Sequence, residues 1–306
     1  MYKFNTLNTP PHTHTHTYIH TKNRPNTGKN YPAYGHKKTV TEQLLKIFFN
    51  IIIKIFFINH PNRISNLFLQ SLNPLAILKF KNHKLKFRTG HGRLLWRVKS
   101  FYSEEKIMVE WLKNISNKDI FLDIGANIGI YTIPAAVNAK LVYACELDLL
   151  NTGILKENIY LNNLNKKIII LPFPALSKNK LSKIFYRDFS KGDALQSINR
   201  KTLLNTNLDK SYSSISLGFS LDYIFKNLKL KYPTKVKIDV DGNEDEVFKG
   251  ASNVIFHAKE VYFEDSGLKN CERHIKAFKN NGYKIIRREK PEKAILGENL
   301  IFKRIN

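Results

Sequence analysis

The chain of 306 residues has only two cysteines, Cys145 and Cys271, too few for the disulfide framework of a small secreted domain. We therefore expect a cytoplasmic protein. One strongly apolar stretch, Leu44 to Ile58, contains two lysines and is shorter than the roughly 20 apolar residues of a membrane-spanning helix. It also lies too far from Met1 to be a signal peptide.

Acidic residues are scarce: 25 Asp and Glu stand against 50 Lys and Arg, which gives a net charge of +25. Such an excess invites a nucleic-acid partner. The basic residues, however, are mostly lysines spread along a chain that is also rich in Asn and Ile, which indicates compositional drift. We find no compact basic stripe with interleaved aromatics, so we expect the partner not to be a nucleic acid. A weak attraction to anionic membrane or acidic glycan is equally allowed.

The chain also lacks Gly-x-Gly-x-x-Gly, the turn with which dinucleotide enzymes hold a pyrophosphate on a helix N-terminus. In its place, Phe121–Thr132 has an apolar run, Asp123, and the pair Gly125 and Gly129, a pattern that predicts a buried strand turning into a helix. An acid at this point would repel a pyrophosphate, but it suits the ammonium and sulfonium charges of S-adenosylmethionine. The local sequence, including Asn127 between the glycines, therefore favours S-adenosylmethionine as cofactor.

A second acid, Glu146, ends the next apolar strand. It lies about 20 residues further on, the usual distance for a carboxylate that accepts ribose hydroxyls. The residues thus predict a cofactor site formed by Asp123, Gly125, Asn127, Gly129 and Glu146. The alternative is a plain strand–helix turn without a ligand.

Strand-like and helix-like stretches alternate from Asp119 onward, which predicts an α/β fold with a mainly parallel sheet. We expect an amphipathic helix over residues 105–115 and strands near residues 119–124, 141–146, 167–172, 234–240, 259–264, 283–288 and 298–303. The stretch of about 173–233 exceeds an ordinary crossover, so it is expected to be an insertion with extra strands or a lid.

The part before this domain divides in two. Residues 1–40 are rich in Pro, Thr, His and Asn, which predicts a disordered low-complexity tail, and the catalytic domain is expected over residues 74–306. Residues 41–73 form an apolar or amphipathic helical segment, in which Lys46, Asn50 and Lys54 would make one narrow polar stripe. This helix either lies at a membrane interface, on the inner face, or packs on the domain or a partner subunit.

The second group of acids follows a later strand, in Val236–Ala251. The strand delivers Asp239 and Asp241 to its carboxyl end, where ligands of open α/β sheets bind, and Glu244 stands in the following helical turn. Close carboxylates can raise one another's pKa, which suits a general base, or they can bind a divalent cation. We therefore take all three as catalytic candidates and leave the metal open, with Asp222 and Glu264 as further candidates. Alternatively, Glu244 caps the helix and the aspartates anchor the turn.

The chain resembles the FkbM-like methyltransferases. The resemblance rests on blocks within residues 87–290: Phe121–Thr132, Tyr143–Glu146, Asn158–Asn163, Ala175–Ser177, Ser220–Tyr223 and Lys237–Ala251. It implies a Rossmann-like, doubly wound seven-stranded sheet, methyl transfer from S-adenosylmethionine, usually to a hydroxyl oxygen, and a cofactor site that includes Tyr131, Thr132 and Ala175. The family's usual Pro and Glu are replaced here by Leu147 and Asp241.

These observations predict an O-methyltransferase for a hydroxyl of a sugar or glycan, as in polysaccharide biosynthesis, or of a lipid or secondary metabolite. Asp239 or Asp241 would accept the hydroxyl proton. One alternative is a nucleic-acid methyltransferase, although the chain lacks the Asn/Asp-Pro-Pro-aromatic segment that often follows the fourth strand of base-amine methylators. The other alternative is a non-enzymatic, membrane-associated binding protein with a decayed site.

Overall fold

The computed structural model describes residues 40–54, 73–90, 92–186, 190–194, 196–198, 212–265, 271–290 and 297–305. Most of the predicted tail and residues 55–72 of the predicted helical segment lie outside these ranges. The chain forms two compact units, Met1–Ile55 and Phe56–Asn306, which are described separately.

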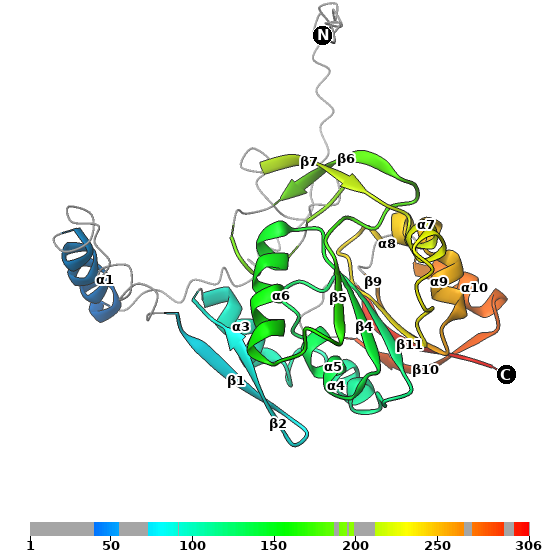
Figure 1. Cartoon of the computed structure of the whole chain (residues 1–306), viewed down its shortest axis with the longest axis horizontal. Helices are drawn as coiled ribbons and strands as arrows, with labels where there is room; N and C mark the ends of the chain where they lie inside the picture. Colours follow the sequence, from blue (N-terminus) through cyan, green and yellow to red (C-terminus); the bar gives the residue numbers. More distant parts are fainter. Residues whose placement is uncertain are drawn as a thin grey trace, which may run out of the picture. The chain divides into compact units, whose positions relative to one another are not determined.

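The larger unit is built on a seven-stranded sheet in the order β10-β11-β9-β8-β3-β4-β5 (Figure 1). The strands are β3 (Ile120–Ile124), β4 (Leu141–Cys145), β5 (Ile168–Leu171), β8 (Lys235–Ile238), β9 (Glu260–Asp265), β10 (Tyr283–Glu289) and β11 (Glu298–Arg304). Strands β5, β4, β3, β8 and β9 pair in parallel, whereas β11 is antiparallel to both of its neighbours. All seven predicted strands and the predicted Rossmann-like α/β class are confirmed.

The centre of the sheet is also where the chain changes direction. From β3 the chain moves outward to β4 and β5, and it later returns to the other side of β3 as β8. Every residue of β3 and β8 is buried, as is usual for parallel strands covered on both faces. The carboxyl ends of β3 and β8 therefore flank the switch point, where open α/β sheets bind their ligands.

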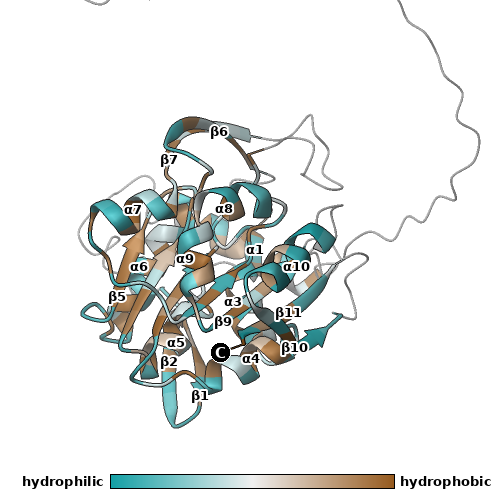
Figure 2. Ribbon diagram, turned by 90° about the vertical axis from the view of Figure 1, so that its right-hand side faces the viewer, coloured by the Kyte–Doolittle hydropathy of each residue, from teal (hydrophilic) through white to brown (hydrophobic). Residues whose placement is uncertain are grey.

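Helices cover both faces of the sheet. Their bounds are α3 (Gly92–Ser100), α4 (Lys106–Lys113), α5 (Thr132–Asn138), α6 (Leu149–Leu161), α7 (Leu221–Asn227), α8 (Glu244–Gly250), α9 (Ser252–His257) and α10 (Cys271–Asn280). Figure 2 shows largely hydrophobic strands between helices whose outer faces are hydrophilic. Asp148 and Ser220 cap α6 and α7 by accepting a backbone N–H of the first turn. Helix α4 confirms the predicted amphipathic helix.

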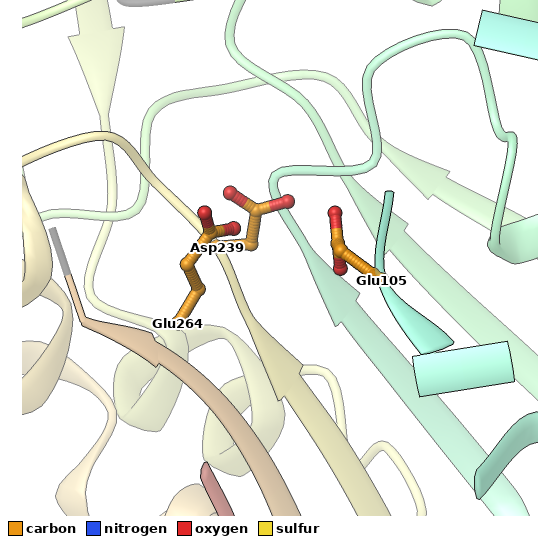
Figure 3. A group of neighbouring side chains, drawn as sticks. All are labelled: Glu105, Asp239 and Glu264. Atoms are coloured by element: carbon orange, nitrogen blue, oxygen red, sulfur yellow. The ribbon is translucent and has the colours of Figure 1, made fainter. Parts of the chain in front are cut away.

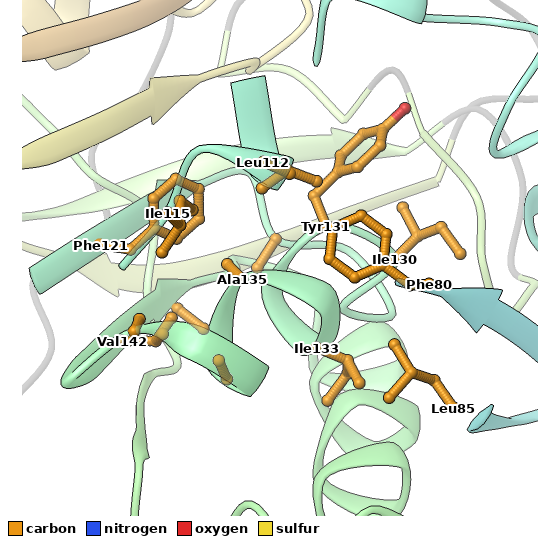
Figure 4. Close-up of a cluster of buried hydrophobic side chains, with 14 of the residues drawn as sticks. Phe80, Leu85, Leu112, Ile115, Phe121, Ile130, Tyr131, Ile133, Ala135 and Val142 are labelled. Atoms are coloured by element: carbon orange, nitrogen blue, oxygen red, sulfur yellow. The ribbon is translucent and has the colours of Figure 1, made fainter. Parts of the chain in front are cut away.

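Two hairpins extend the unit beyond the sheet. One consists of β1 (Leu75–Phe80) and β2 (His83–Arg88), the other of β6 (Lys180–Tyr186) and β7 (Tyr212–Gly218). The second hairpin confirms the extra strands predicted for the insertion. The first was not predicted; its inner side chains join the buried cluster of α4, α5 and the glycine turn, where Phe80 and Leu85 lie near Ile130 and Ile133 (Figure 4).

The smaller unit contains helix α1 (Val40–Ile53). The predicted apolar helix is confirmed over residues 44–53, begins at Val40 rather than later, and its predicted end at residue 58 lies outside the described ranges. Among the described helices, none combines the length and the hydropathy that crossing a membrane requires.

Candidate active site

The turn between β3 and α5 requires its glycines. Gly125 and Gly129 have φ angles of +89° and +85°, and Asn127 between them has +49°. A Cβ on Gly125 would lie 1.8 Å from the carbonyl oxygen of Asp239, and one on Gly129 would lie 2.5 Å from Leu155 Cδ1. The amides of Gly125 and Ala126 both donate to the carbonyl of Cys145. The turn is therefore held tightly between β4 and β8.

The acid at the end of β3 is directed inward. Asp123 is fully buried; its Oδ2 accepts a hydrogen bond of 2.6 Å from Thr132 Oγ1, and its Oδ1 lies 3.2 Å from Lys237 Nζ. The structure thus brings together two predicted cofactor residues, Asp123 and Thr132, but uses their side chains to join β3, α5 and β8. Direct contact of either with the cofactor stays a prediction.

Glu146, at the carboxyl end of β4, has the environment expected of a ribose-binding acid. Its two carboxylate oxygens accept the backbone N–H of Asn127 at 2.6 Å and of Asp148 at 2.8 Å. Burial raises its pKa to about 7. Since a carboxylate offers about four acceptor positions, it can still receive two hydroxyl groups. The tight glycine turn and this acid together fit the nucleoside part of S-adenosylmethionine.

A short segment of the insertion, residues 190–198 with Leu195 outside the described ranges, lies against this end of the site; we call it the strap. The carbonyl of its Asp193 accepts three side-chain amide hydrogen bonds, from Asn127 at 2.7 Å, Asn151 at 3.0 Å and Gln196 at 3.1 Å. Asn151 also accepts the N–H of Gly192 at 2.7 Å. The side chain of Asn127, predicted to bind the cofactor, therefore holds the strap.

The opposite side of the strap is held by α3. Arg93 Nη1 lies 2.7 Å from Asp193 Oδ1, whose side chain is fully buried, and Arg97 Nε donates to the carbonyl of Gly192 at 2.9 Å. The charge of Arg97 opposes the effect of burial on the pKa of both Glu146 and Asp239, so Arg97 faces both ends of the site. None of these arginines was selected from the sequence.

Three carboxylates meet beside the glycine turn: Glu105 before α4, Asp239 after β8 and Glu264 in β9 (Figure 3). One oxygen of each lies within 4.8 Å of the others, which is the arrangement of a shared proton or of a cation site. Lys237, whose side chain is 1% exposed, contributes a positive charge, with its Nζ 2.9 Å from Asp239 Oδ2. Tyr262 donates a hydrogen bond of 2.8 Å to Glu105 Oε2.

The three carboxyls have different proton affinities. Burial and the charge of Asp239 raise the pKa of Glu105 to about 7. Burial and the same neighbour raise the pKa of Glu264 well above its ordinary value. Burial alone would raise the pKa of Asp239 too, but the charge of Lys237 together with hydrogen bonds to Glu264 and Lys237 outweighs it, and the pKa is lowered. Asp239 therefore holds a proton least tightly of the three, Glu264 holds one more tightly than an ordinary carboxyl, and Glu105 can gain or lose one near neutrality.

Only some of the predicted catalytic residues belong to this acid cluster. Asp239 belongs to the cluster. Asp241, in a left-handed conformation with φ +47°, is close enough to raise the pKa of Glu264 but is not one of the three clustered acids. Glu244 accepts the N–H of Gly242 at 2.9 Å, which ties the turn before α8, whose N-cap residue is Asn243. Asp222 accepts N–H groups at the start of α9.

The two remaining predicted cofactor residues lie apart. Tyr131 lies beside the acid cluster, because its ring is 5.5 Å from Lys237 Nζ, and burial and the charge of Glu105 raise the pKa of its hydroxyl well above the ordinary value. Ala175 follows β5 and forms an isolated bridge with Phe219. Glu105 was missed as a catalytic candidate, although it and Glu104 are the first acids after a stretch of 31 residues, 73–103, without Asp or Glu.

The order of the strands and this site define a class I methyltransferase, and comparisons with known proteins agree. A family model described as the TRM5/TYW2 methyltransferase domain matches residues 79–175. A curated protein from Phytophthora infestans (strain T30-4), tRNA (guanine(37)-N(1))-methyltransferase, is 31% identical over 85 residues, which are 28% of this chain and 20% of that protein.

Solved structures with a similar fold include the tRNA m1G37 methyltransferase of M. jannaschii, at 14% identity and a TM-score of 0.41, covering 77% of this chain and 58% of that one. The methyltransferase FkbM from Methylobacillus flagellatus KT has 16% identity and a TM-score of 0.45, covering 66% and 50%. The chain thus spans a fifth of the curated relative and 50–58% of these two structures.

The comparisons confirm two predictions and overturn others. The protein is a methyltransferase that uses S-adenosylmethionine, as predicted, since the matched segment includes the glycine turn and Glu146. The assignment to the FkbM-like family is wrong, because the model that matches is TRM5/TYW2. The prediction of a sugar, lipid or polysaccharide hydroxyl as acceptor is wrong for the same reason. The expectation that the partner is not a nucleic acid is wrong as well. The blocks behind the resemblance include the glycine turn and Glu146, which also lie within the segment that the TRM5/TYW2 model matches.

Proposed function

We propose that this protein transfers a methyl group from S-adenosylmethionine to a ring nitrogen of guanine in tRNA. The observation that carries the proposal is the TRM5/TYW2 match over residues 79–175, which includes Glu105 as well as the cofactor turn. The curated tRNA (guanine(37)-N(1))-methyltransferase, similar over 85 residues, and the net charge of +25 support the same acceptor. The localisation expected from the sequence, the cytoplasm, is compatible with a tRNA substrate.

The chemistry of the acceptor supports the assignment of a base. N1 of guanine carries a proton, so it can attack a methyl carbon only as that proton leaves. A carboxylate with a pKa near neutrality is suited to receive it, because it is ionised at pH 7 yet still binds a proton well. Glu105, with its pKa of about 7, meets this requirement.

The neighbours of Glu105 support this role. Lys237 holds Asp239 ionised, and the protonated Glu264 donates to Asp239, so the proton of the acceptor has one place to go. Tyr262 donates to Glu105 and orients its carboxylate. The three clustered carboxyl oxygens could also hold a divalent cation.

The cofactor supplies an electrophilic methyl carbon on a sulfonium. Guanine N1 would form the new C–N bond with that methyl carbon, and the sulfur would leave with the electron pair of the C–S bond. The proton of N1 passes to Glu105. Glu146 would hold the ribose, and the glycine turn would keep the backbone close to the nucleoside, so that the reacting atoms stay within about 3–3.5 Å.

The test uses the full chain, S-adenosylmethionine labelled in the methyl group, and an unmodified tRNA transcript. We expect label in the RNA and 1-methylguanosine after nuclease digestion and mass spectrometry. A transcript with adenine in place of the methylated guanine should accept none. If the protein binds S-adenosylhomocysteine but labels no tRNA, the proposed acceptor is wrong while the methyltransferase class stands.

A further inference from the structure

The hairpin β1–β2 buries four apolar side chains and exposes its lysines, and two apolar side chains of β1, Leu75 and Ile77, are exposed as well. Alternation along its strands buries Leu78, Phe80, Leu85 and Phe87 against the core. Along the same hairpin, five basic or titratable side chains are exposed: Lys79, Lys81, His83, Lys84 and Lys86. We call these five residues the basic ribbon.

The sequence around the basic ribbon contains no acidic residue that would balance its positive charge. Residues 73–103 contain eight Lys and Arg and no Asp or Glu. Lys79 and Lys84 stand directly opposite each other across the two strands, a placement that is destabilising for like charges unless an anion lies between or above them. The nearby Glu157 of α6 pairs with Arg88, at the end of the hairpin, with 2.7 Å between Arg88 Nε and Glu157 Oε2.

The basic ribbon is also fixed relative to the cofactor site. Asn162 of α6 accepts the N–H of Lys86 at 2.9 Å and donates to its carbonyl at 2.8 Å, as a neighbouring strand would. Asn158, one turn earlier, accepts the N–H of Arg88 at 2.9 Å and donates to the carbonyl of Ile128 in the glycine turn at 2.9 Å. These hydrogen bonds therefore fix the position of a ligand on the basic ribbon relative to the glycine turn of the proposed cofactor site.

We propose that the basic ribbon binds the phosphate backbone of the RNA whose base is methylated; this rests on the proposed function. Exposed lysines on a rigid support provide the sequence-independent contacts that fix an RNA's position, while the site selects the base. An anionic lipid surface has similar charge chemistry, but all five residues of the ribbon fall within the segment matched by the TRM5/TYW2 domain, which favours RNA.

The test compares two variants that lose the same charge. The ribbon variant carries Lys79→Thr, Lys81→Asn, Lys84→Thr and Lys86→Thr. The control carries Lys118→Ser, Lys140→Ser, Lys166→Ser and Lys259→Ser, four exposed lysines at the amino ends of β3, β4, β5 and β9, the edge opposite the cofactor site. Binding of an unmodified tRNA transcript is followed by fluorescence anisotropy from 50 to 200 mM KCl.

For the ribbon variant, we expect the slope of log K against log salt to shrink by about one for each lysine that contacts a phosphate, and its KM for tRNA to rise at least tenfold. The control should change the slope by less than one in total. If both variants lost the same affinity for tRNA, net charge alone would explain the loss and the proposal would be overturned. Normal tRNA binding by the ribbon variant would also overturn it.

Two further measurements separate the remaining outcomes. Titration with S-adenosylhomocysteine reports whether each variant is folded, and it should give the wild-type Kd. Co-sedimentation with phosphatidylserine vesicles tests the lipid surface: loss of vesicle binding with intact RNA binding would overturn the proposal. If wild type methylates tRNA and the ribbon variant does so with unchanged KM, only the ribbon assignment fails. If wild type neither binds nor methylates tRNA, the proposed function fails as well.

Discussion

The two halves of the sheet contribute different parts of the site. Residues 79–175, with β3, β4 and β5, supply the glycine turn, Glu146 and Glu105, and this half is matched by the TRM5/TYW2 domain. The later half, with β8 and β9, supplies Lys237, Asp239 and Glu264 and lies outside the match. In the proposed function, the first half would bind the cofactor, whereas Lys237 and Asp239 of the second half act on the pKa of Glu105. The proposed reaction therefore requires both halves.

The largest effect is expected from Glu105→Gln, which removes the base but keeps the shape. Turnover should fall by roughly 10²–10⁴, because general-base catalysis contributes that much. Affinity for S-adenosylhomocysteine should stay the same. Glu104→Gln is the matched control, with wild-type turnover expected. Methyl transfer to the tRNA transcript under single-turnover conditions measures the difference, and a turnover above one tenth of wild type would rule out Glu105 as the base.

Lys237→Met tests the contact between the halves. It leaves the buried Asp123 and the partly buried Asp239 without their shared cation, and removal of one partner from a buried ion pair costs about 3–5 kcal/mol. Urea unfolding should show this loss. Lys113→Met, at an exposed pair, should leave the midpoint of unfolding unchanged. A stable Lys237→Met protein would mean that the two aspartates do not depend on this lysine.

Asn151→Ala tests the strap. The substitution removes two hydrogen bonds, to the carbonyl of Asp193 and from the N–H of Gly192, each of about 0.5–1.5 kcal/mol. If the strap bounds the cofactor site, calorimetry should show a Kd for S-adenosylhomocysteine about tenfold higher. Asn227→Ala, at the exposed end of α7, is the control. An unchanged Kd would show that the strap does not take part in cofactor binding.

The pH dependence tests Glu146 within the cofactor half. Burial raises its pKa to about 7, so the folded protein binds this proton more tightly than the unfolded chain does. Its contribution to stability is therefore present below about pH 4.5 and is lost as the pH rises to about 7. Cofactor affinity changes in the opposite direction, because the ionised carboxylate accepts ribose hydroxyls. Between pH 6 and 8 the affinity should rise about tenfold, and Glu146→Gln should abolish this rise.

The sequence of this protein predicts those features whose residues lie close together along the chain. The strands, the glycine turn and the placement of Glu146 follow from local patterns of apolar residues, glycine and acid. The acid cluster does not, because Glu105, Asp239 and Glu264 come from three distant segments and meet only when β8 and β9 pair. Spacing instead favoured Asp241 and Glu244, which are neighbours of Asp239 in the chain but serve the turn.

The charge was misjudged for the same reason. Counted along the chain, the lysines are dispersed, and the alternation in β1 and β2 is short and polar. Only the pairing of the two strands places Lys79 opposite Lys84, with Lys86 two residues further along β2 and Lys81 in the turn between the strands. The basic surface thus depends on the pairing of the two strands. These contacts assign no role to the low-complexity tail or to helix α1.

The smallest effect is expected from removing metal. The three clustered oxygens have the spacing of a cation site, but Lys237 already places a positive charge 2.9 Å from Asp239, and Glu264 carries a proton that a bound cation would have to displace. Turnover should therefore change less than about twofold after dialysis against EDTA, since one charge and one proton already balance the acids. A loss that added Mg²⁺ or Mn²⁺ restores would assign the cluster to a cation, and Glu105 would then be a ligand rather than the base.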